Sequence, residues 1–202
     1  GQWTGDAILV PSDGAGADRF GWSVALSDTH ISVGATLHDL PWTSAGAVYV
    51  FNAAGAYAQT AKLSPLDDNE NASTFGTSVA MSDGAIVLIG APESIGSLFP
   101  YITGRVYLFE NKDNGKGWTQ TRVSDDLSGH NYFGYGVALD TANGAAIIGS
   151  AREEMDGVNT RGAHRPYVVS SSCGNSNGGY AVLVGLAVAG TVVVGTAGAA
   201  GG

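Results

Sequence analysis

Acidic residues are the first candidates for chemistry in this chain, because clustered carboxylates can hold a metal ion. Glu153, Glu154 and Asp156 form the best acidic cluster among the loops that follow the second apolar run of each repeat. Neither this loop nor its counterparts in the chain carry the D-x-D-x-D-G spacing that brings enough oxygen ligands to one calcium ion. We interpret the cluster as a solvated acidic loop, with a weak calcium site as the alternative.

A second acidic set recurs in register along the chain. Asp13, Asp68 and Asp126 each lie seven residues before the phenylalanine of a Phe-Gly pair. Such recurrence indicates a shared structural task, for example a turn in which the carboxylate accepts backbone N–H groups. The alternative is a ring of carboxylates on one face that holds cations or repels anions.

The other residue types with catalytic potential are dispersed. His30, His38, His130 and His164 lie in different loops without a paired metal-ligand spacing. The sequence has no phosphate-binding loop or dinucleotide fingerprint, although a Ser-His-Asp set drawn from distant positions stays open. The single cysteine, Cys173, excludes an intrachain disulfide and a multi-cysteine zinc site. We therefore expect a protein that is not an enzyme and has no cofactor beyond the calcium alternative.

Loop aromatics are the better candidates for a functional surface. Trp42, Phe99 and Tyr101 lie in long loops after the second apolar run of their repeats. Amphipathic rings of this kind can recognise a protein or a glycan. The alternative is that they only pack the loop against the sheet.

An internal repeat indicates which elements position these residues. Three copies of one pattern begin at Phe20, Phe75 and Phe133, spaced by 55 and 58 residues. They read FGWSVALSDTHISVGAT, FGTSVAMSDGAIVLIGAP and FGYGVALDTANGAAIIGSA, and a weaker copy, VGLAVAGTVVVGTAG, begins at Val184. Each repeat offers four short β-type runs, which predicts a four-stranded antiparallel blade.

The repeat predicts a single domain over residues 1–202. Its expected parts are an outer strand of an incomplete blade at 1–19, repeats at 20–74, 75–132 and 133–183, and a partial repeat at 184–202. The fold class is thus all-β, built from about four blades.

The Phe-Gly pair followed by Gly-Ala-Pro, present as Phe75-Gly76 and Gly90-Ala91-Pro92, resembles the FG-GAP repeat. That family includes the propeller heads of integrin alpha chains and many bacterial and algal surface proteins. The resemblance covers nearly the whole chain, but the later copies replace Gly-Ala-Pro by Gly149-Ser150-Ala151 and Gly195-Thr196-Ala197. It implies a β-propeller or partial propeller of about four FG-GAP-like blades.

The repeated residues are expected to be structural. Glycine after the aromatic residue allows the innermost strand to pack closely, and the phenylalanine fills the space between neighbouring blades. This expectation covers Phe20, Gly21, Phe75, Gly76, Phe133 and Gly134, together with the three repeated aspartates.

The ends of the repeat array leave several alternatives open. About four repeats are fewer than the seven typical of the resembled family, so the ring needs more chain, closes tightly, or leaves open ends that pair with other copies. Head-to-tail pairing that does not close gives a filament. A remote alternative is a membrane-anchoring helix at 180–202, a stretch without charged residues.

Composition narrows the possible partners and the location. A formal net charge of −9 disfavours binding to nucleic acid or to an anionic membrane surface. The absence of an initiating methionine and the sequon at Asn71 fit an exported protein. We expect a secreted or cell-surface module for adhesion, ligand or matrix contact, with a protein or glycan as partner. The alternative is a self-assembling protomer of an extracellular, glycosylated filament.

Overall fold

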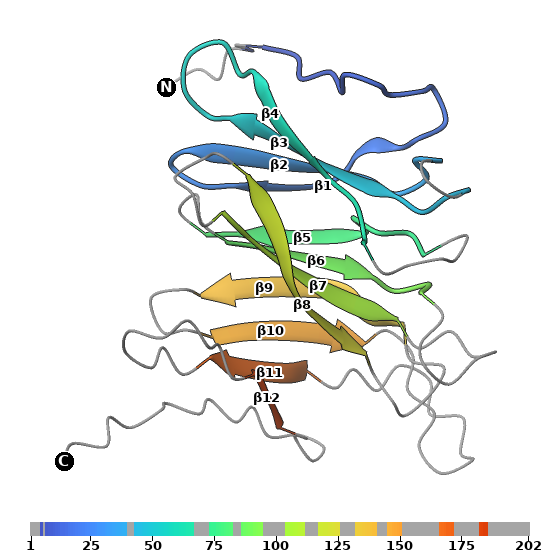
Figure 1. Cartoon of the computed structure of the whole chain (residues 1–202), viewed down its shortest axis with the longest axis vertical. Helices are drawn as coiled ribbons and strands as arrows, with labels where there is room; N and C mark the ends of the chain where they lie inside the picture. Colours follow the sequence, from blue (N-terminus) through green and yellow to red (C-terminus); the bar gives the residue numbers. More distant parts are fainter. Residues whose placement is uncertain are drawn as a thin grey trace.

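The computed structural model describes residues 5, 7–39, 43–66, 73–82, 86–94, 104–111, 117–125, 132–140, 145–150, 166–171 and 182–185. The twelve strands in these residues form three four-stranded antiparallel sheets. Figure 1 shows the sheets stacked in chain order. The predicted fold class is confirmed, because the chain is all-β and its sheets are blades of a partial propeller.

The strands follow one another across each sheet in sequence order. The first sheet contains β1 (Phe20–Leu26), β2 (His30–Ala35), β3 (Ala47–Asn52) and β4 (Gln59–Leu63). The second contains β5 (Ser78–Met81), β6 (Ile86–Ala91), β7 (Arg105–Asn111) and β8 (Trp118–Asp125). The third contains β9 (Phe133–Asp140), β10 (Ala145–Ser150), β11 (Pro166–Ser171) and β12 (Val182–Gly185). The first strands of neighbouring sheets contact each other, β1 with β5 and β5 with β9.

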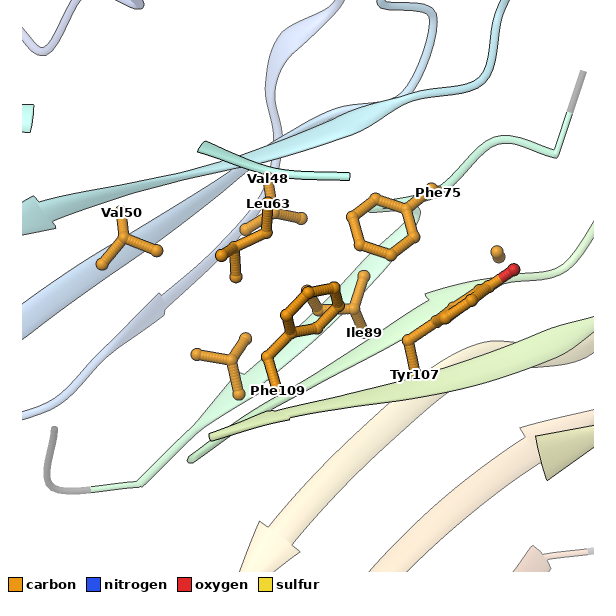
Figure 2. Packing of buried hydrophobic residues seen from close by; sticks show 9 residues of the cluster. Val48, Val50, Leu63, Phe75, Ile89, Tyr107 and Phe109 are labelled. Atoms are coloured by element: carbon orange, nitrogen blue, oxygen red, sulfur yellow. The ribbon is translucent and has the colours of Figure 1, made fainter. Parts of the chain in front are cut away.

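Alternation along the strands supplies side chains to both faces of each sheet. In β6, Val87 and Ile89 face the first sheet, whereas Leu88 faces the third. Figure 2 shows the core between the first two sheets, which consists of Val48, Val50, Leu63, Phe75, Val87, Ile89, Ala91, Tyr107 and Phe109. The core between the second and third sheets consists of Leu88, Val106, Phe133, Ala146 and Ile148. Burying each large side chain contributes about 1.5–3 kcal/mol, so these two cores hold the stack together.

The phenylalanines of the first two repeats make edge-to-face ring contacts with the aromatic residues of the third strand in their own sheets. The ring centroid of Phe75 lies 5.2 Å from that of Tyr107 and 6.0 Å from that of Phe109. Phe20 packs in the same way against the two aromatic residues of β3, with centroid distances of 5.7 and 6.1 Å. The Phe-Gly position is therefore structural in the sheets where its contacts are described.

Backbone geometry explains the glycines around this phenylalanine. Gly46, just before β3, bridges to Phe75 of the next sheet, and Gly104, just before β7, bridges to Phe133. Both glycines have positive φ, 83° and 80°. A Cβ on Gly46 would lie 2.7 Å from the backbone nitrogen of Phe75, and one on Gly76 would lie 2.8 Å from the carbonyl oxygen of Ala47. Only glycine allows neighbouring sheets to approach this closely.

The two ends of the stack differ from the sequence-based expectation. The described residues of 1–19 contain no strand, although an outer strand was expected there. A strand needs a partner edge, and no described sheet precedes the first one. At the other end, Val184 and Gly185 pair with β11 as part of β12, the fourth strand of the third sheet. Val184 was expected to begin the first strand of a further repeat, but it belongs to the last strand of the third sheet. Pairing there satisfies the backbone groups at the edge of β11.

Candidate functional site

Most of the predicted site residues lie outside the described residues, and their roles stay predictions. They are the loop aromatics Trp42, Phe99 and Tyr101, the acidic cluster Glu153, Glu154 and Asp156, the sequon residue Asn71, and the repeated Asp68 and Asp126. The third residue of the sequon, Ser73, is described. It is buried, and its hydroxyl donates to the carbonyl of Ala45 at 2.7 Å. Ser73 therefore lies at the junction between the first two sheets.

The described residues bring one polar cluster together, at the first sheet. Residues 7–19, which we call the strap, contribute Asp13 and Asp18. The first sheet contributes Tyr49 of β3, Lys62 of β4 and His38, which follows β2. We call these five residues the strap cluster. Segments that are distant in the sequence meet here, so the cluster ties the strap to the sheet.

His38 lies at the centre of the strap cluster and is only 3% exposed. Its Nδ1 lies 2.8 Å from Oδ2 of Asp18, and its Nε2 lies 2.6 Å from Nζ of Lys62. Because a lysine ammonium group can only donate hydrogen bonds, Nε2 accepts and Nδ1–H donates to Asp18. The contacts therefore assign the neutral Nδ1–H tautomer of His38.

Asp13 accepts two further hydrogen bonds at the rim of the strap cluster. The Tyr49 hydroxyl donates to Oδ1 at 2.7 Å, and the Lys62 ammonium group donates to Oδ2 at 2.7 Å. Both donors are side chains, whereas the sequence predicted that the Asp13 carboxylate would accept backbone N–H groups. A carboxylate that accepts a backbone N–H is found at Asp18, whose Oδ2 accepts the N–H of Ala15 at 2.8 Å.

The electrostatics of the strap cluster favour its ionised carboxylates. The hydrogen bond from Lys62, aided by Tyr49, lowers the pKa of Asp13 against the opposing effect of burial. Burial acts to raise the pKa of Asp18, but hydrogen bonds from Ala15 and His38 outweigh it and the pKa is lowered. Burial and the neighbouring Asp13 raise the pKa of Tyr49, which keeps its hydroxyl protonated as a donor.

This arrangement binds the strap and does not activate a nucleophile. In a His-based catalytic set, the ring nitrogen opposite the carboxylate faces a hydroxyl or thiol that loses its proton. In His38 that nitrogen faces the ammonium group of Lys62 instead. The polar contacts continue along the strap, where the side chain of Gln59 binds both the N–H and the hydroxyl of Ser12, at 2.9 and 3.0 Å.

A similar contact is found at the connection between the first two sheets. Oε1 of Gln120 in β8 accepts the N–H of Leu66 at 3.0 Å, and Gln120 pairs with Phe109 as Gln59 pairs with Phe51. The strap thus corresponds to the segment that links one blade to the next. It is a linker held on the blade that follows it.

Other kinds of site have little support in the described part of the chain. None of its His, Cys, Asp and Glu side chains form a group of three or more that could hold a metal ion. The same residues contain no helix of the length and apolarity needed to cross a bilayer. Val182–Gly185, inside the stretch considered for a membrane helix, is strand β12.

Sequence reasoning missed Asp18, His38 and Lys62 as partners, because they do not recur. The position of His38 is taken by Ser94 in the second sheet, where Gly104 donates to the Ser94 carbonyl at 3.1 Å as Gly46 donates to that of His38 at 3.0 Å. Only the recurrence of the Asp13 position signalled that this region has a structural task.

Comparison with known proteins identifies the repeat. No curated protein matches the chain. Residues 3–51 match the model of the FG-GAP repeat, and this stretch includes the strap, β1, β2 and most of β3. Phe-Gly pairs equivalent to the one in this stretch precede or begin the second and third sheets. Residues 3–51 therefore contain an FG-GAP repeat, which supports the resemblance that the Phe-Gly and Gly-Ala-Pro motifs indicate.

Proposed function

We propose that this chain is a non-enzymatic, secreted or cell-surface propeller module that binds a protein or glycan ligand in adhesion or matrix contact. FG-GAP repeats are structural or binding modules and are typical of extracellular or adhesion-type proteins. The binding surface that we propose consists of the β2–β3 and β6–β7 connections, with Trp42, Phe99 and Tyr101 as ligand contacts.

The observation that carries this proposal is that two long loops, in equivalent places of the first two sheets, end in the same backbone hydrogen bond. The β2–β3 connection spans residues 36–46, and the β6–β7 connection spans residues 92–104. Each closes on a hydrogen bond from the glycine before the third strand, Gly46 to His38 and Gly104 to Ser94. Because β2 and β6 occupy equivalent places in their sheets, both loops leave the same end of the stack. Loops held by a rigid scaffold are the usual carriers of binding in such folds.

The net charge of the chain favours a ligand with a neutral or basic surface. The net charge of −9 repels polyanions, so a nucleic acid or an anionic lipid surface is disfavoured. Aromatic rings stack on sugar rings and fill pockets of protein partners, and either contact needs no catalytic group.

The test is binding of the 202-residue chain to a glycan array and to a panel of immobilised matrix proteins. For the probes that bind, Trp42→Ala and Tyr101→Ala should weaken binding about tenfold or more, as expected for interface aromatics. The matched control is Trp22→Ala, which removes a ring that is 54% exposed on β1. The proposal is wrong if no probe binds, or if the loop variants bind as tightly as wild type while Trp22→Ala does not.

A further inference from the structure

On the face of the first sheet that points away from the second sheet, the part at β1 is an exposed copy of a covered interface. The part at β2 and β3 is buried, because Val33, Tyr49 and Phe51 form a cluster against which Leu9 of the strap packs. In the second sheet, Val79 and Met81 pack against the core formed with the first sheet. In the third sheet, Val137 and Leu139 pack in the same way against the second. The equivalent residues of β1 are Val24 and Leu26, and they are 67% and 70% exposed.

The backbone of β1 at this face has the same conformation as the strands that contact a neighbouring sheet. Gly21 has φ of +93°, close to the values at Gly76 and Gly134, +88° and +89°. A Cβ on Gly76 or Gly134 would press on a carbonyl oxygen of the preceding sheet, 2.8 and 2.6 Å away, whereas a Cβ on Gly21 would meet nothing within 4 Å. Gly21 thus has the same positive φ as Gly76 and Gly134. At Gly76 and Gly134 the preceding sheet leaves no room for a Cβ, whereas no described sheet approaches Gly21.

The opposite face of the third sheet shows the complementary pattern. Leu88 of β6 is 5% exposed because the third sheet covers it, but the equivalent Ile147 of β10 is 45% exposed. A Cβ on Gly34 or Gly90 would collide with the backbone of the next sheet at Gly76 or Gly134. A Cβ on the equivalent Gly149 would meet only its own sheet, at 3.5 Å from the Gly136 oxygen.

The strap covers the β2–β3 part of this face with Leu9 and leaves the part at β1 exposed. Its polar contacts go to the loop after β2 and to β3 and β4, through His38, Tyr49, Lys62 and Gln59. The corresponding linker contact, Leu66 to Gln120, is present at a junction where the equivalent face is covered. A strap in this position is therefore compatible with a sheet docked on β1.

We propose that the β1 face of one molecule, centred on Val24 and Leu26, docks on the β10 face of a second copy, centred on Ile147 and Gly149. The pairing continues the interface that joins the sheets within the chain. Because the two faces differ and lie at opposite ends of the stack, the contact is heterologous, and each bound copy presents another free face. Head-to-tail association into filaments or closed rings follows. This inference does not depend on ligand binding by the loops.

The test uses sedimentation velocity on the 202-residue chain and three variants. Val24→Asp places a charge at the centre of one face and Ile147→Asp at the centre of the other, and both positions are exposed enough for the fold to be retained. Each change should weaken self-association about tenfold or more, because a buried unpaired carboxylate is costly. Ala54→Asp, at an exposed position in the β3–β4 turn, is the matched control and should associate like wild type.

Mixing the two face variants gives the decisive result. Each retains one intact face, so at a concentration at which each variant alone is monomeric, an equimolar mixture should form dimers and nothing larger. Circular dichroism spectra that match wild type establish that the variants are folded. A wild-type chain that stays monomeric at every concentration overturns the proposal. So does an Ile147→Asp variant that associates like wild type, since that result indicates pairing of two identical faces.

Discussion

Gly46 and Gly104 lie at two of the close approaches between neighbouring sheets. Each has positive φ, and an added Cβ on either would press on the backbone of the next phenylalanine, Phe75 or Phe133. Glycine is required at these positions both for its positive φ and because there is no room for a Cβ. Comparison with Gly55 separates the two effects. Gly55 also has positive φ, 75°, but nothing lies within 4 Å of an added Cβ.

We expect Gly46→Ala to destabilise the chain more than Gly55→Ala. The positive φ alone costs about 1–2 kcal/mol in each variant. In Gly46→Ala the backbone of Phe75 must also move, which disturbs the core between the first two sheets. Urea denaturation should therefore give a larger loss of unfolding free energy for Gly46→Ala. Equal losses for the two variants would contradict the role assigned to the junction.

The strap cluster predicts a pH dependence of stability. The pKa of Asp18 is lowered in the folded chain from its ordinary 3.8, so ionised Asp18 stabilises the fold above that pH. This stability is lost as the pH falls through the lowered pKa. Asp18→Asn should be less stable than wild type at neutral pH, and the difference should shrink as the pH falls below 3.8.

Chemical denaturation across this pH range checks the prediction. The control is Asp28→Asn, an exposed carboxylate in the β1–β2 turn, which should change the unfolding free energy by less than about 0.5 kcal/mol. A gap between wild type and Asp18→Asn that does not change with pH would show that the carboxylate charge of Asp18 is not what stabilises the strap.

At the scale of elements, the phenylalanine of the repeat decides how firmly one sheet is attached to the next. Phe75 is fully buried, and Phe75→Ala should cost about 3–5 kcal/mol because it leaves a cavity among Tyr107, Phe109 and the valines of the first sheet. Tyr135→Ala, which removes a ring that is 57% exposed on β9, should cost much less. Thermal unfolding compares the two. A Phe75→Ala variant as stable as Tyr135→Ala would be inconsistent with this packing.

The strands could be predicted from the sequence because the repeat shows the same alternation three times. The prediction was less accurate at element ends. β5 begins at Ser78, whereas β1 and β9 begin at the phenylalanine, although the residues on both sides of the phenylalanine have positive φ in all three repeats. The strap cluster was not predictable, since Asp18 and His38 are 20 residues apart and have no counterparts in the later repeats.

At the scale of the whole molecule, the interface between sheets can be repeated beyond the chain. The same contact serves twice within the stack, and its two halves are exposed at opposite ends, at Val24 and at Ile147. The net charge of −9 on each copy opposes association, so added salt should strengthen it by screening. Loop ligands would then be displayed repeatedly along an assembly.

The most direct test of this account is the mass of the wild-type chain in solution, measured by sedimentation velocity over a series of concentrations. If the open blade faces continue the interface within the stack, the average mass rises with concentration above the 20.4 kDa of one chain. The rise should be larger at high salt and absent in Val24→Asp. A mass that stays at 20.4 kDa throughout the series would contradict the account.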